Sequence, residues 1–236
     1  MKRIYFCCVI LVATTGAALK ASTVLLDAGA DADPSEVAMA NRGTELVEKG
    51  DYAGARKCYD AALRRVPTDW LTYYARAEVF IHDRQWQLAL KDLDTCTRLK
   101  KSFFLAFLTR GIVNTHLGNY KSSLAEYDMI LNLNPMEGAK ALALSSRAWL
   151  RATCPNASFR NGQQAVSDAK AACSWSGWHK PDYVDTLAAA YAEAGDFDNA
   201  VKFEEKAISK IHDADTLKGA QHRLAVYREH RPFRDG

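Results

Sequence analysis

The sequence lacks the short motifs that mark the common enzyme classes. It contains no H-E-x-x-H metal helix, no Walker phosphate loop, no G-x-S-x-G nucleophile turn and no glycine-rich dinucleotide turn. Its six histidines are scattered, although His82 and His116 occupy equivalent places in an internal repeat and could form a metal or pH-sensing pair. Two histidines are too few ligands for a metal site. We therefore expect no catalytic residue, no metal and no cofactor, and histidines that are solvated or lie at helix ends.

The chain also has little excess charge of either sign. Thirty-one Lys and Arg residues oppose 28 Asp and Glu residues, which gives a net charge of +3. Loss of an N-terminal leader containing Lys2 and Arg3, or Lys20 as well, would lower this to +1 or 0 (3 minus 2 or 3). Such a balance gives no reason to expect a nucleic-acid partner.

Outside the N-terminus, long apolar runs are missing too. The run from Ile4 to Leu19 follows two basic residues and precedes small ones, which predicts a signal peptide over residues 1–21 and a linker over 22–35. The run of about sixteen residues is shorter than the ~20 of a membrane-spanning helix. We therefore expect cleavage and export to a bacterial periplasm, with no stable membrane span and with the cleavage bond left open. An uncleaved signal that anchors the chain in the inner membrane is the alternative.

What the sequence does contain is a regular internal repeat. Gly50-Asp51-Tyr52 recurs as Arg84-Gln85-Trp86 and, after the same interval, as Gly118-Asn119-Tyr120. Arg42-Gly43, Arg76-Ala77 and Arg110-Gly111 follow the same spacing, and a further copy lies around Gly195-Asp196-Phe197. Several positions that recur together at one period, here about 34 residues, indicate stacked structural units.

These residues resemble the tetratricopeptide repeat (TPR) family over about Glu36 to His212. The resemblance implies an all-α fold, a right-handed superhelical solenoid of helix-turn-helix units. Small residues at the eighth and twentieth positions, such as Ala77 and Ala89, would let the two helices of a unit approach closely. One hairpin cannot bury its apolar face alone, so neighbouring units must stack, and a concave inner surface follows.

Five units and a cap account for the chain after the linker. The units span about 36–69, 70–103, 104–137, 138–180 and 181–213, which together form a TPR domain over 36–213, and a capping helix with a basic tail occupies 214–236. In the helix expected near Ala214 to Glu229, Leu217, Ala220, Leu224 and Tyr227 form one stripe, while Lys218, His222, Arg223 and Arg228 lie mostly elsewhere.

Two stretches depart from the repeat. In the second unit Arg84-Gln85 replaces the Gly-Asp of the turn, which leaves the geometry of that turn open. In the fourth unit the interval from Ala148 to Ala165 is longer by five than the interval between equivalent positions of the other units, such as Ala77 and Ala89. The sequence TCPNASFRNG therefore contains an insertion of five residues, and its Pro, Asn and Gly predict an enlarged turn rather than an active site.

A comparison of the units with one another suggests an ion-pair ladder. The seventh position holds Arg76, Arg110 and Arg147, and the twenty-third holds Asp92, Glu126 and Asp168. The fifth unit has Leu187 and Phe203 at these positions, so charge accompanies charge and apolar accompanies apolar. We therefore expect the two positions to face each other as a structural salt bridge. The first unit breaks the rule, because there Arg42 meets Cys58.

Outside the leader the sequence has four cysteines, Cys58, Cys96, Cys154 and Cys173, whose spacing fits neither a disulfide framework nor a zinc site. Cys154 and Cys173 should lie near opposite ends of a hairpin about 15 Å long, whereas a disulfide needs Cα atoms within about 7 Å. We expect free thiols, with Cys96 packed in the core.

The resemblance also implies where a ligand would bind. In the family, ligands usually lie against the first helix of each unit. The corresponding side chains here are Leu71, Tyr74, Glu78, Ile81, Leu105, Leu108, Ile112, Leu142, Ser145 and Trp149. The last unit adds an acidic end with Asp182, Asp185 and Glu193. In the alternative, Tyr74 and Trp149 only pack between helices and bind nothing.

The function that follows is a non-enzymatic scaffold or adaptor that binds a protein or peptide segment in the concave TPR groove. Some co-chaperone TPRs clamp a C-terminal carboxylate with Lys and Asn, but Ala40 and Thr44 occupy those places here, so binding of a chaperone tail is disfavoured. An accessory subunit of a bacterial envelope assembly or peptidoglycan machine is the alternative, and a hydrolase using Cys154 is a third hypothesis. The partner's identity and the oligomeric state stay open.

Overall fold

The computed structural model describes residues 34–133 and 137–235, and every regular element within them is a helix. The predicted signal peptide and nearly all of the predicted linker lie outside the described residues. In the described part, no helix has both the length and the hydropathy needed to cross a bilayer. The prediction of an all-α chain is confirmed.

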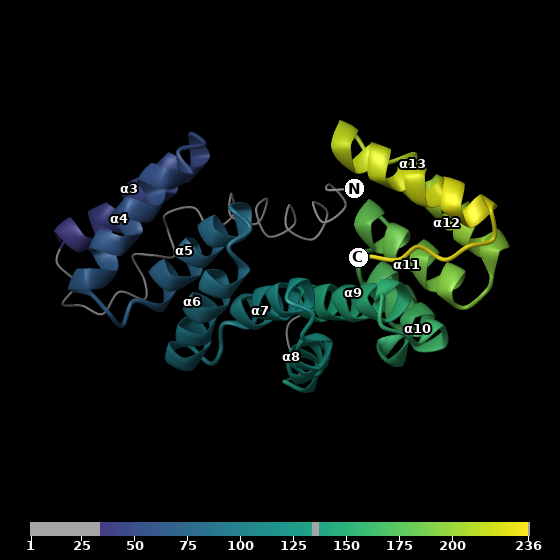
Figure 1. Cartoon of the computed structure of the whole chain (residues 1–236), viewed down its shortest axis with the longest axis horizontal. Coiled ribbons are helices and arrows are strands. Elements are labelled where there is room, and N and C mark those ends of the chain that lie inside the picture. Colours follow the sequence, from purple (N-terminus) through teal and green to yellow (C-terminus); the bar gives the residue numbers. More distant parts are fainter. Residues whose placement is uncertain (1–33, 134–136, 236) are drawn as a thin grey trace. The chain divides into compact units, whose positions relative to one another are not determined.

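The helices are short and follow one another closely, as Figure 1 shows. Their bounds are α3 Pro34–Glu48, α4 Tyr52–Arg65, α5 Trp70–His82, α6 Trp86–Leu99, α7 Phe104–His116, α8 Tyr120–Asn132, α9 Glu137–Thr153, the short 3₁₀ helix η1 Ala157–Phe159, α10 Gly162–Trp175, α11 Pro181–Glu193, α12 Phe197–Ile208 and α13 Ala214–Arg228.

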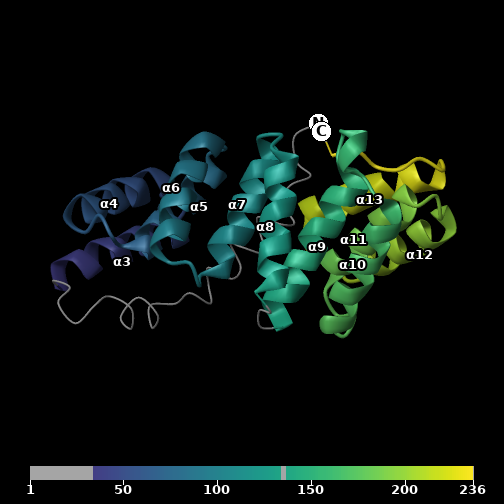
Figure 2. The same ribbon diagram turned by 90° about the horizontal axis from the view of Figure 1, so that it is seen from below.

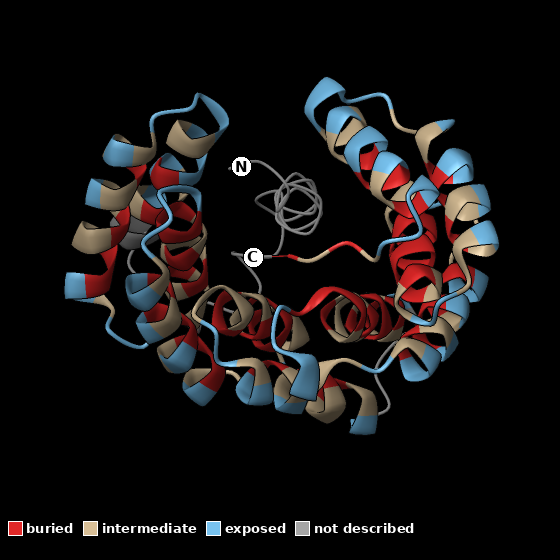
Figure 3. Cartoon of the chain, turned by 45° about the vertical axis from the view of Figure 1, so that its right-hand side comes forward, coloured by how far each residue is buried: buried red, intermediate tan, exposed pale blue. Residues whose placement is uncertain are grey.

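The chain divides into two compact units, which we call the N-terminal unit (described residues 34–119) and the C-terminal unit (120–235). In the N-terminal unit α3 packs on α4, α5 on α6, and α7 against α6. In the C-terminal unit α9 packs on α8, α10 and α11, while α12 packs on α11 and α13 (Figure 2). Within each unit the buried residues lie where consecutive helices face one another (Figure 3). The five predicted repeats each span two of these helices, and α13 follows them.

Close contact between paired helices depends on the small residues that the repeat predicted. Ala55, Ala77, Ala89, Ala188 and Ala200 are all fully buried. Gly43 allows a still closer approach, because a Cβ there would lie 2.5 Å from the Tyr59 ring. Larger side chains at these positions would force the helices apart, which would remove the dispersion contacts that make up most of the core.

In the first two repeats the aromatic residue after the turn stacks on the end of the first helix of the following repeat. Tyr52 stacks on His82 with ring centroids 3.5 Å apart, and Trp86 stacks on His116 at 4.0 Å with the rings 4° from parallel. Burial lowers the pKa of His116 to about 4. The two histidines therefore occupy equivalent packing positions at helix ends. No group of three or more potential metal ligands occurs among the described residues.

The predicted ion-pair ladder is present where both partners lie in the N-terminal unit or both lie in the C-terminal unit. The Arg76 guanidinium donates to both carboxylate oxygens of Asp92, at 2.7 and 2.8 Å, and Arg147 binds Asp168 in the same forked way at 2.8 Å. Arg110 binds Asp94 and Thr97. Arg110 lies in the N-terminal unit and Glu126 in the C-terminal unit, so their pairing stays a prediction.

Each arginine also reaches back to the preceding repeat, which the sequence comparison missed. Arg76 donates to Asp60 at 2.8 Å and Arg147 to Asp128 at 2.6 Å. Asp60, Asp94 and Asp128 recur at the repeat period, so the same periodicity search could have found them. One guanidinium thus ties the second helices of two successive repeats together.

The TCPNASFRNG stretch is an enlarged turn, as predicted. α9 ends at Thr153, η1 follows, and the Asn161 side chain accepts a hydrogen bond from the backbone of Gln164 to begin α10. A Cβ on Gly162 would lie 2.6 Å from the backbone nitrogen of Ala194, so only glycine permits this close approach of α10 to the end of α11. From the insertion Phe159 packs on Tyr120, with centroids 5.5 Å apart, so this turn supplies its own aromatic partner.

The helix expected near Ala214 to Glu229 is present as α13, and one expectation about its faces needs correction. Ala220, Leu224 and Tyr227 are buried as the stripe predicted. The expectation that Arg223 lies away from the buried side is wrong, because Arg223 is only 3% exposed and binds Asp185 at 2.8 Å. A helix wheel treats arginine as a surface residue, but here buried carboxylates on α11 and α12 compensate its charge.

The turn of the second repeat has the same backbone shape as the other turns, but there the shape is strained. Arg84 has φ 58°, close to the φ of 76–82° found at Gly50, Gly118 and Gly195. Left-handed backbone costs a residue with a Cβ roughly 1–2 kcal/mol.

We expect Arg84→Gly to raise the free energy of unfolding by about 1 kcal/mol, because relief of this strain exceeds the added entropy of the unfolded chain. Chemical denaturation followed by circular dichroism measures the change. Gly118→Ala is the matched control and should destabilise. A less stable Arg84→Gly chain would contradict the strain.

For the ladder, Arg76→Met should lower the free energy of unfolding by about 3 kcal/mol, because it strands the Asp92 carboxylate, which is only 5% exposed. Asp60→Asn, at a carboxylate 40% exposed, should cost less than about 1 kcal/mol. The double change Arg76→Met with Asp92→Leu should recover most of the loss. Equal effects of Arg76→Met and Asp60→Asn in denaturant titrations would count against this assignment.

Candidate functional site

The groove residues predicted for the N-terminal unit differ in how accessible they are. Leu71, Leu105 and Ile112 are partly exposed on α5 and α7, whereas Tyr74, Ile81 and Leu108 are buried. The Tyr74 hydroxyl lies 3.3 Å from Oγ1 of Thr109 and its ring meets Phe103 edge-on at 5.0 Å. Tyr74 therefore packs between helices, and the partly exposed aliphatic side chains are the members of the predicted set that solvent reaches.

Glu78 gives this surface an unusual acid. It lies on α5, one turn after Tyr74, and burial raises the pKa of its carboxyl group to about 7, while a hydrogen bond with Tyr74 opposes the rise. Its charge in turn helps to raise the pKa of the Tyr59 and Tyr74 hydroxyls. A carboxylate held in apolar surroundings would gain most from a cationic side chain of a ligand.

In the C-terminal unit the predicted groove residues lie on α9. Leu142 is partly exposed, and the buried Ser145 exchanges a hydrogen bond with Thr186 of α11 at 3.2 Å. Trp149 is partly exposed and its indole nitrogen donates to Oδ2 of Asp235 at 2.8 Å. Of the three, Trp149 is thus the one that contacts an extended piece of polypeptide.

That piece is the segment Arg231–Asp235, which we call the tail. It leaves α13 through His230, whose ring stacks on Phe197 at 5.3 Å and whose φ is 54°. Figure 1 shows it as the yellow coil segment that crosses α11 toward α9. Phe233 is 8% exposed, with its ring 6.2 Å from that of Trp149 and 6.3 Å from that of His222.

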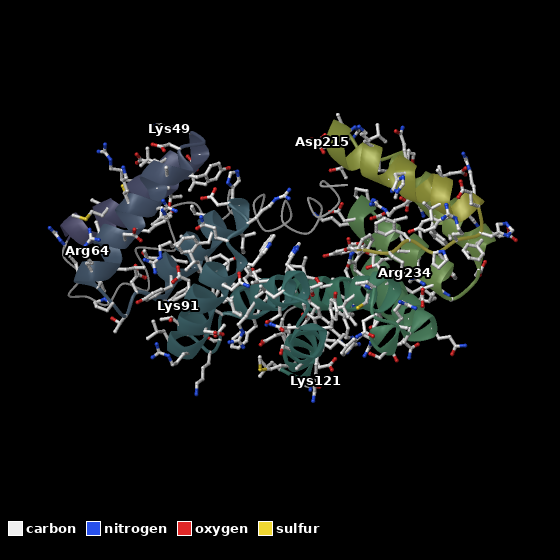
Figure 4. The ribbon with its side chains drawn as sticks, in the orientation of Figure 1. Lys49, Arg64, Lys91, Lys121, Asp215 and Arg234 are labelled. Atoms are coloured by element: carbon white, nitrogen blue, oxygen red, sulfur yellow. The ribbon has the colours of Figure 1, made fainter. Side chains whose placement is uncertain are left out.

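The last two residues of the tail make polar contacts with α9 and α11. The Asp235 backbone N–H donates to the carbonyl of Thr153 at 2.9 Å, and Arg234 donates to the carbonyl of Ala152 at 3.2 Å. Arg234, which is labelled in Figure 4, also pairs with Glu193 at 2.6 Å. The carbonyls that a helix leaves unpaired at its C-terminal end are thereby satisfied by the tail.

The acidic end predicted for the fifth unit is neutralised by the chain itself. Glu193 binds Arg160 of the enlarged turn at 3.0 Å in addition to Arg234. Asp185 is buried against Arg223, which also lies 3.3 Å from Glu204. Burial and the neighbouring Asp185 hold the pKa of Glu204 well above its usual range. Two of the three predicted acids therefore belong to internal ion pairs.

Comparison with known proteins identifies the repeat. A sequence model of the tetratricopeptide repeat family matches residues 41–96. PilW, a type IV pilus biogenesis factor, aligns with a TM-score of 0.67 at 17% identity over 84% of this chain and 91% of PilW. MamA of Desulfovibrio magneticus RS-1 aligns with a TM-score of 0.59 at 14% identity over 75% of this chain and 96% of MamA. Residues 41–96 thus match the tetratricopeptide repeat family, and the described helices share the fold of tetratricopeptide repeat solenoids.

Part of the chain also matches curated proteins. Stress-induced-phosphoprotein 1 of Caenorhabditis elegans is 30% identical over 95 residues, which are 40% of this chain and 30% of the worm protein. The matched segment thus covers less than a third of that relative. The likenesses to PilW and MamA are low in sequence identity and concern the fold alone.

The surroundings of the four described cysteines do not resemble those of a catalytic nucleophile. Cys58, Cys96, Cys154 and Cys173 are free thiols. Burial raises the pKa of Cys96 and Cys173 to about 12 and also raises that of Cys154. The thiolate is the reactive form, so these environments oppose the chemistry that a Cys154 hydrolase needs.

The buried carboxyl group of Glu78 should make the free energy of unfolding depend on pH. The folded pKa of Glu78, about 7, exceeds the ordinary value of 4.5, so the folded state binds the extra proton and stability falls as the pH rises from about 4.5 to 7. Glu78→Gln removes this loss and should raise the free energy of unfolding by about 2 kcal/mol at pH 8, with little change at pH 4.

Urea titrations of both chains across this pH range measure the effect. Glu48→Gln, at an exposed position at the end of α3, is the control and should leave the pH profile unchanged. A Glu78→Gln chain whose stability parallels that of the parent at every pH would show that the carboxyl group titrates as it does in water.

Proposed function

We propose that this protein is a non-enzymatic TPR scaffold that binds an extended protein segment along the first helices of its repeats. The observation that carries the proposal is the contact of Trp149 with the tail, in which a predicted groove residue binds an extended stretch of polypeptide through its indole N–H. Partly exposed Leu71, Leu105 and Ile112 offer the equivalent surface in the N-terminal unit. Such aliphatic and aromatic side chains are typical anchors of protein interfaces.

The mode of binding differs from capture of a chain end by a carboxylate clamp. Ala40 is buried and the Thr44 hydroxyl is engaged with the carbonyl of Ala40 and the hydroxyl of Tyr59, both at 3.3 Å. Neither position carries a cation for a terminal carboxylate. Although Stress-induced-phosphoprotein 1 is a relative, we propose that the ligand here is an internal segment.

We further propose that the protein works outside the cytoplasm of a bacterium, in the periplasm, on the basis of the leader pattern in residues 1–21. Retention in the inner membrane by an uncleaved leader is the other outcome of that pattern. A role as accessory subunit of an envelope machine rests on the same leader alone, because the similarity to PilW is one of fold.

The test uses the chain without residues 1–21 as bait in a bacterial envelope extract, with captured proteins quantified by mass spectrometry. Leu105→Arg places a charge on the predicted groove of α7 and should reduce the specific partners at least tenfold. Leu88→Arg is the matched control, because Leu88 is 47% exposed on α6, the second helix of its pair. Circular dichroism confirms that both variants are folded.

If the Leu105→Arg chain retains its partners as well as the Leu88→Arg chain does, the groove of the N-terminal unit is not the binding surface. If Leu88→Arg alone loses them, the binding surface lies on the second helices.

A further inference from the structure

We propose that the inner face of the C-terminal unit is a binding site for an extended peptide with an aromatic, a basic and an acidic residue in succession, and that the tail is its built-in occupant. The proposal rests on the proposed function, because it names the ligand class of one part of the same surface. It concerns α9, α11 and α13 only.

Each residue of the Phe233-Arg234-Asp235 triplet meets a group suited to it. The phenyl ring of Phe233 lies between the rings of Trp149 and His222. The Arg234 guanidinium pairs with Glu193, whose side chain is 14% exposed. The Asp235 carboxylate accepts the indole N–H of Trp149. Ring, cation and anion are thus recognised by three different chemistries along one short stretch of chain.

The end of α9 orients the bound chain. The carbonyl of Thr153 accepts the backbone N–H of Asp235, which any residue could supply, whereas the carbonyl of Ala152 accepts from the Arg234 guanidinium and so adds to the preference for a basic residue. If the site were empty, carbonyls at the end of α9 and a partly buried carboxylate would lose hydrogen-bond partners, which would raise the free energy of the folded chain. The tail removes that cost when no partner is bound.

The tail is also placed to be displaced. It is irregular from Arg231 onward and joins α13 through His230, and the Arg234 side chain remains 34% exposed. Because only a few residues separate it from α13, its effective concentration at the site is on the order of millimolar. A partner segment with the same triplet must outcompete it, so binding of a partner would release the tail.

The closing experiment measures peptide binding to the purified chain without residues 1–21. The probe is a fluorescein-labelled Arg-Pro-Phe-Arg-Asp amide, followed by anisotropy. In the Arg234→Glu chain repulsion from Glu193 should loosen the tail, and we expect this chain to bind the probe at least tenfold more tightly than the parent chain does. Arg228→Glu is the control, since Arg228 pairs with Glu205 on an exposed surface, and it should behave like the parent.

Sequence preference is tested with altered probes on the Arg234→Glu chain. Replacement of the probe's Phe by Ala, or of its second Arg by Glu, should weaken binding at least tenfold. Trp149→Phe added to Arg234→Glu removes the indole donor but keeps a ring, and it should weaken the parent probe about fivefold while leaving a probe that ends in Ala, which has no side-chain acceptor, almost unchanged.

The proposal is overturned if a folded Arg234→Glu chain binds the probe no better than the parent, or binds all probes equally. If Arg234→Glu does not fold, Asp235→Asn serves as the milder variant with the same expected order of affinities. Sedimentation of the parent chain tests whether the tail of a second copy occupies the site. A concentration-dependent dimer that Arg234→Glu abolishes would assign the site to that second copy and would overturn the proposal of a separate peptide partner.

The two proposals can fail separately. Loss of partners from the Leu105→Arg chain tests the N-terminal unit in extract, whereas the probe tests the C-terminal unit in purified protein. Binding of the probe without any effect of Leu105→Arg would keep the triplet site and reject the groove of the N-terminal unit.

Discussion

Among the described helices of residues 34–133 and 137–235, a pair packs against a neighbouring helix as well as within itself, because one hairpin cannot cover its own apolar face, and this constraint governs the rest of the structure. In a hairpin such as α5 and α6, which pack on each other, Ala77 and Ala89 are fully buried, but the outer side of the pair needs the next hairpin. The arginine at the seventh position answers this need with charge, because Arg76 and Arg147 each join aspartates from two successive repeats. Stacking is therefore specified both by apolar contact, which tolerates sliding, and by an arginine that a forked pair fixes within its own repeat and that donates a further hydrogen bond to the aspartate of the preceding repeat.

The same constraint explains the variation among the turns. The aromatic residue after each turn fills the gap to the next repeat, and it stacks on His82 or His116 where the spacing is regular. Where the fourth repeat contains an insertion, Phe159 takes that place against Tyr120. The inserted turn thus preserves the packing rule while it adds Arg160, which joins Glu193. A stretch that resembled an active site in sequence serves the stacking of helices.

Periodicity made most of the fold predictable. Helix pairs, small contact residues and two ladder pairs recur in register, so repeats within one chain supply the information that related sequences normally supply. Arg223 was placed wrongly because the rule that charged residues face solvent fails when Asp185 and Glu204 share its charge. Arg84 shows a second limit, since the turn keeps its left-handed backbone although the residue does not favour it.

The candidate site was less predictable, for a physical reason. The position of Trp149 on the inner face follows from the repeat, but the partner of its indole is Asp235, far along the chain in a segment with no repeat pattern. The last hairpin of a stack has one face with no further repeat to cover it, and α13 covers the side formed by α12. The last two carbonyls of α9, those of Ala152 and Thr153, and the oxygen of Glu193 that Arg160 does not bind need donors rather than apolar side chains. Arg234 and the backbone of Asp235 supply them, so the end of the stack is completed by a peptide bound as a ligand would be.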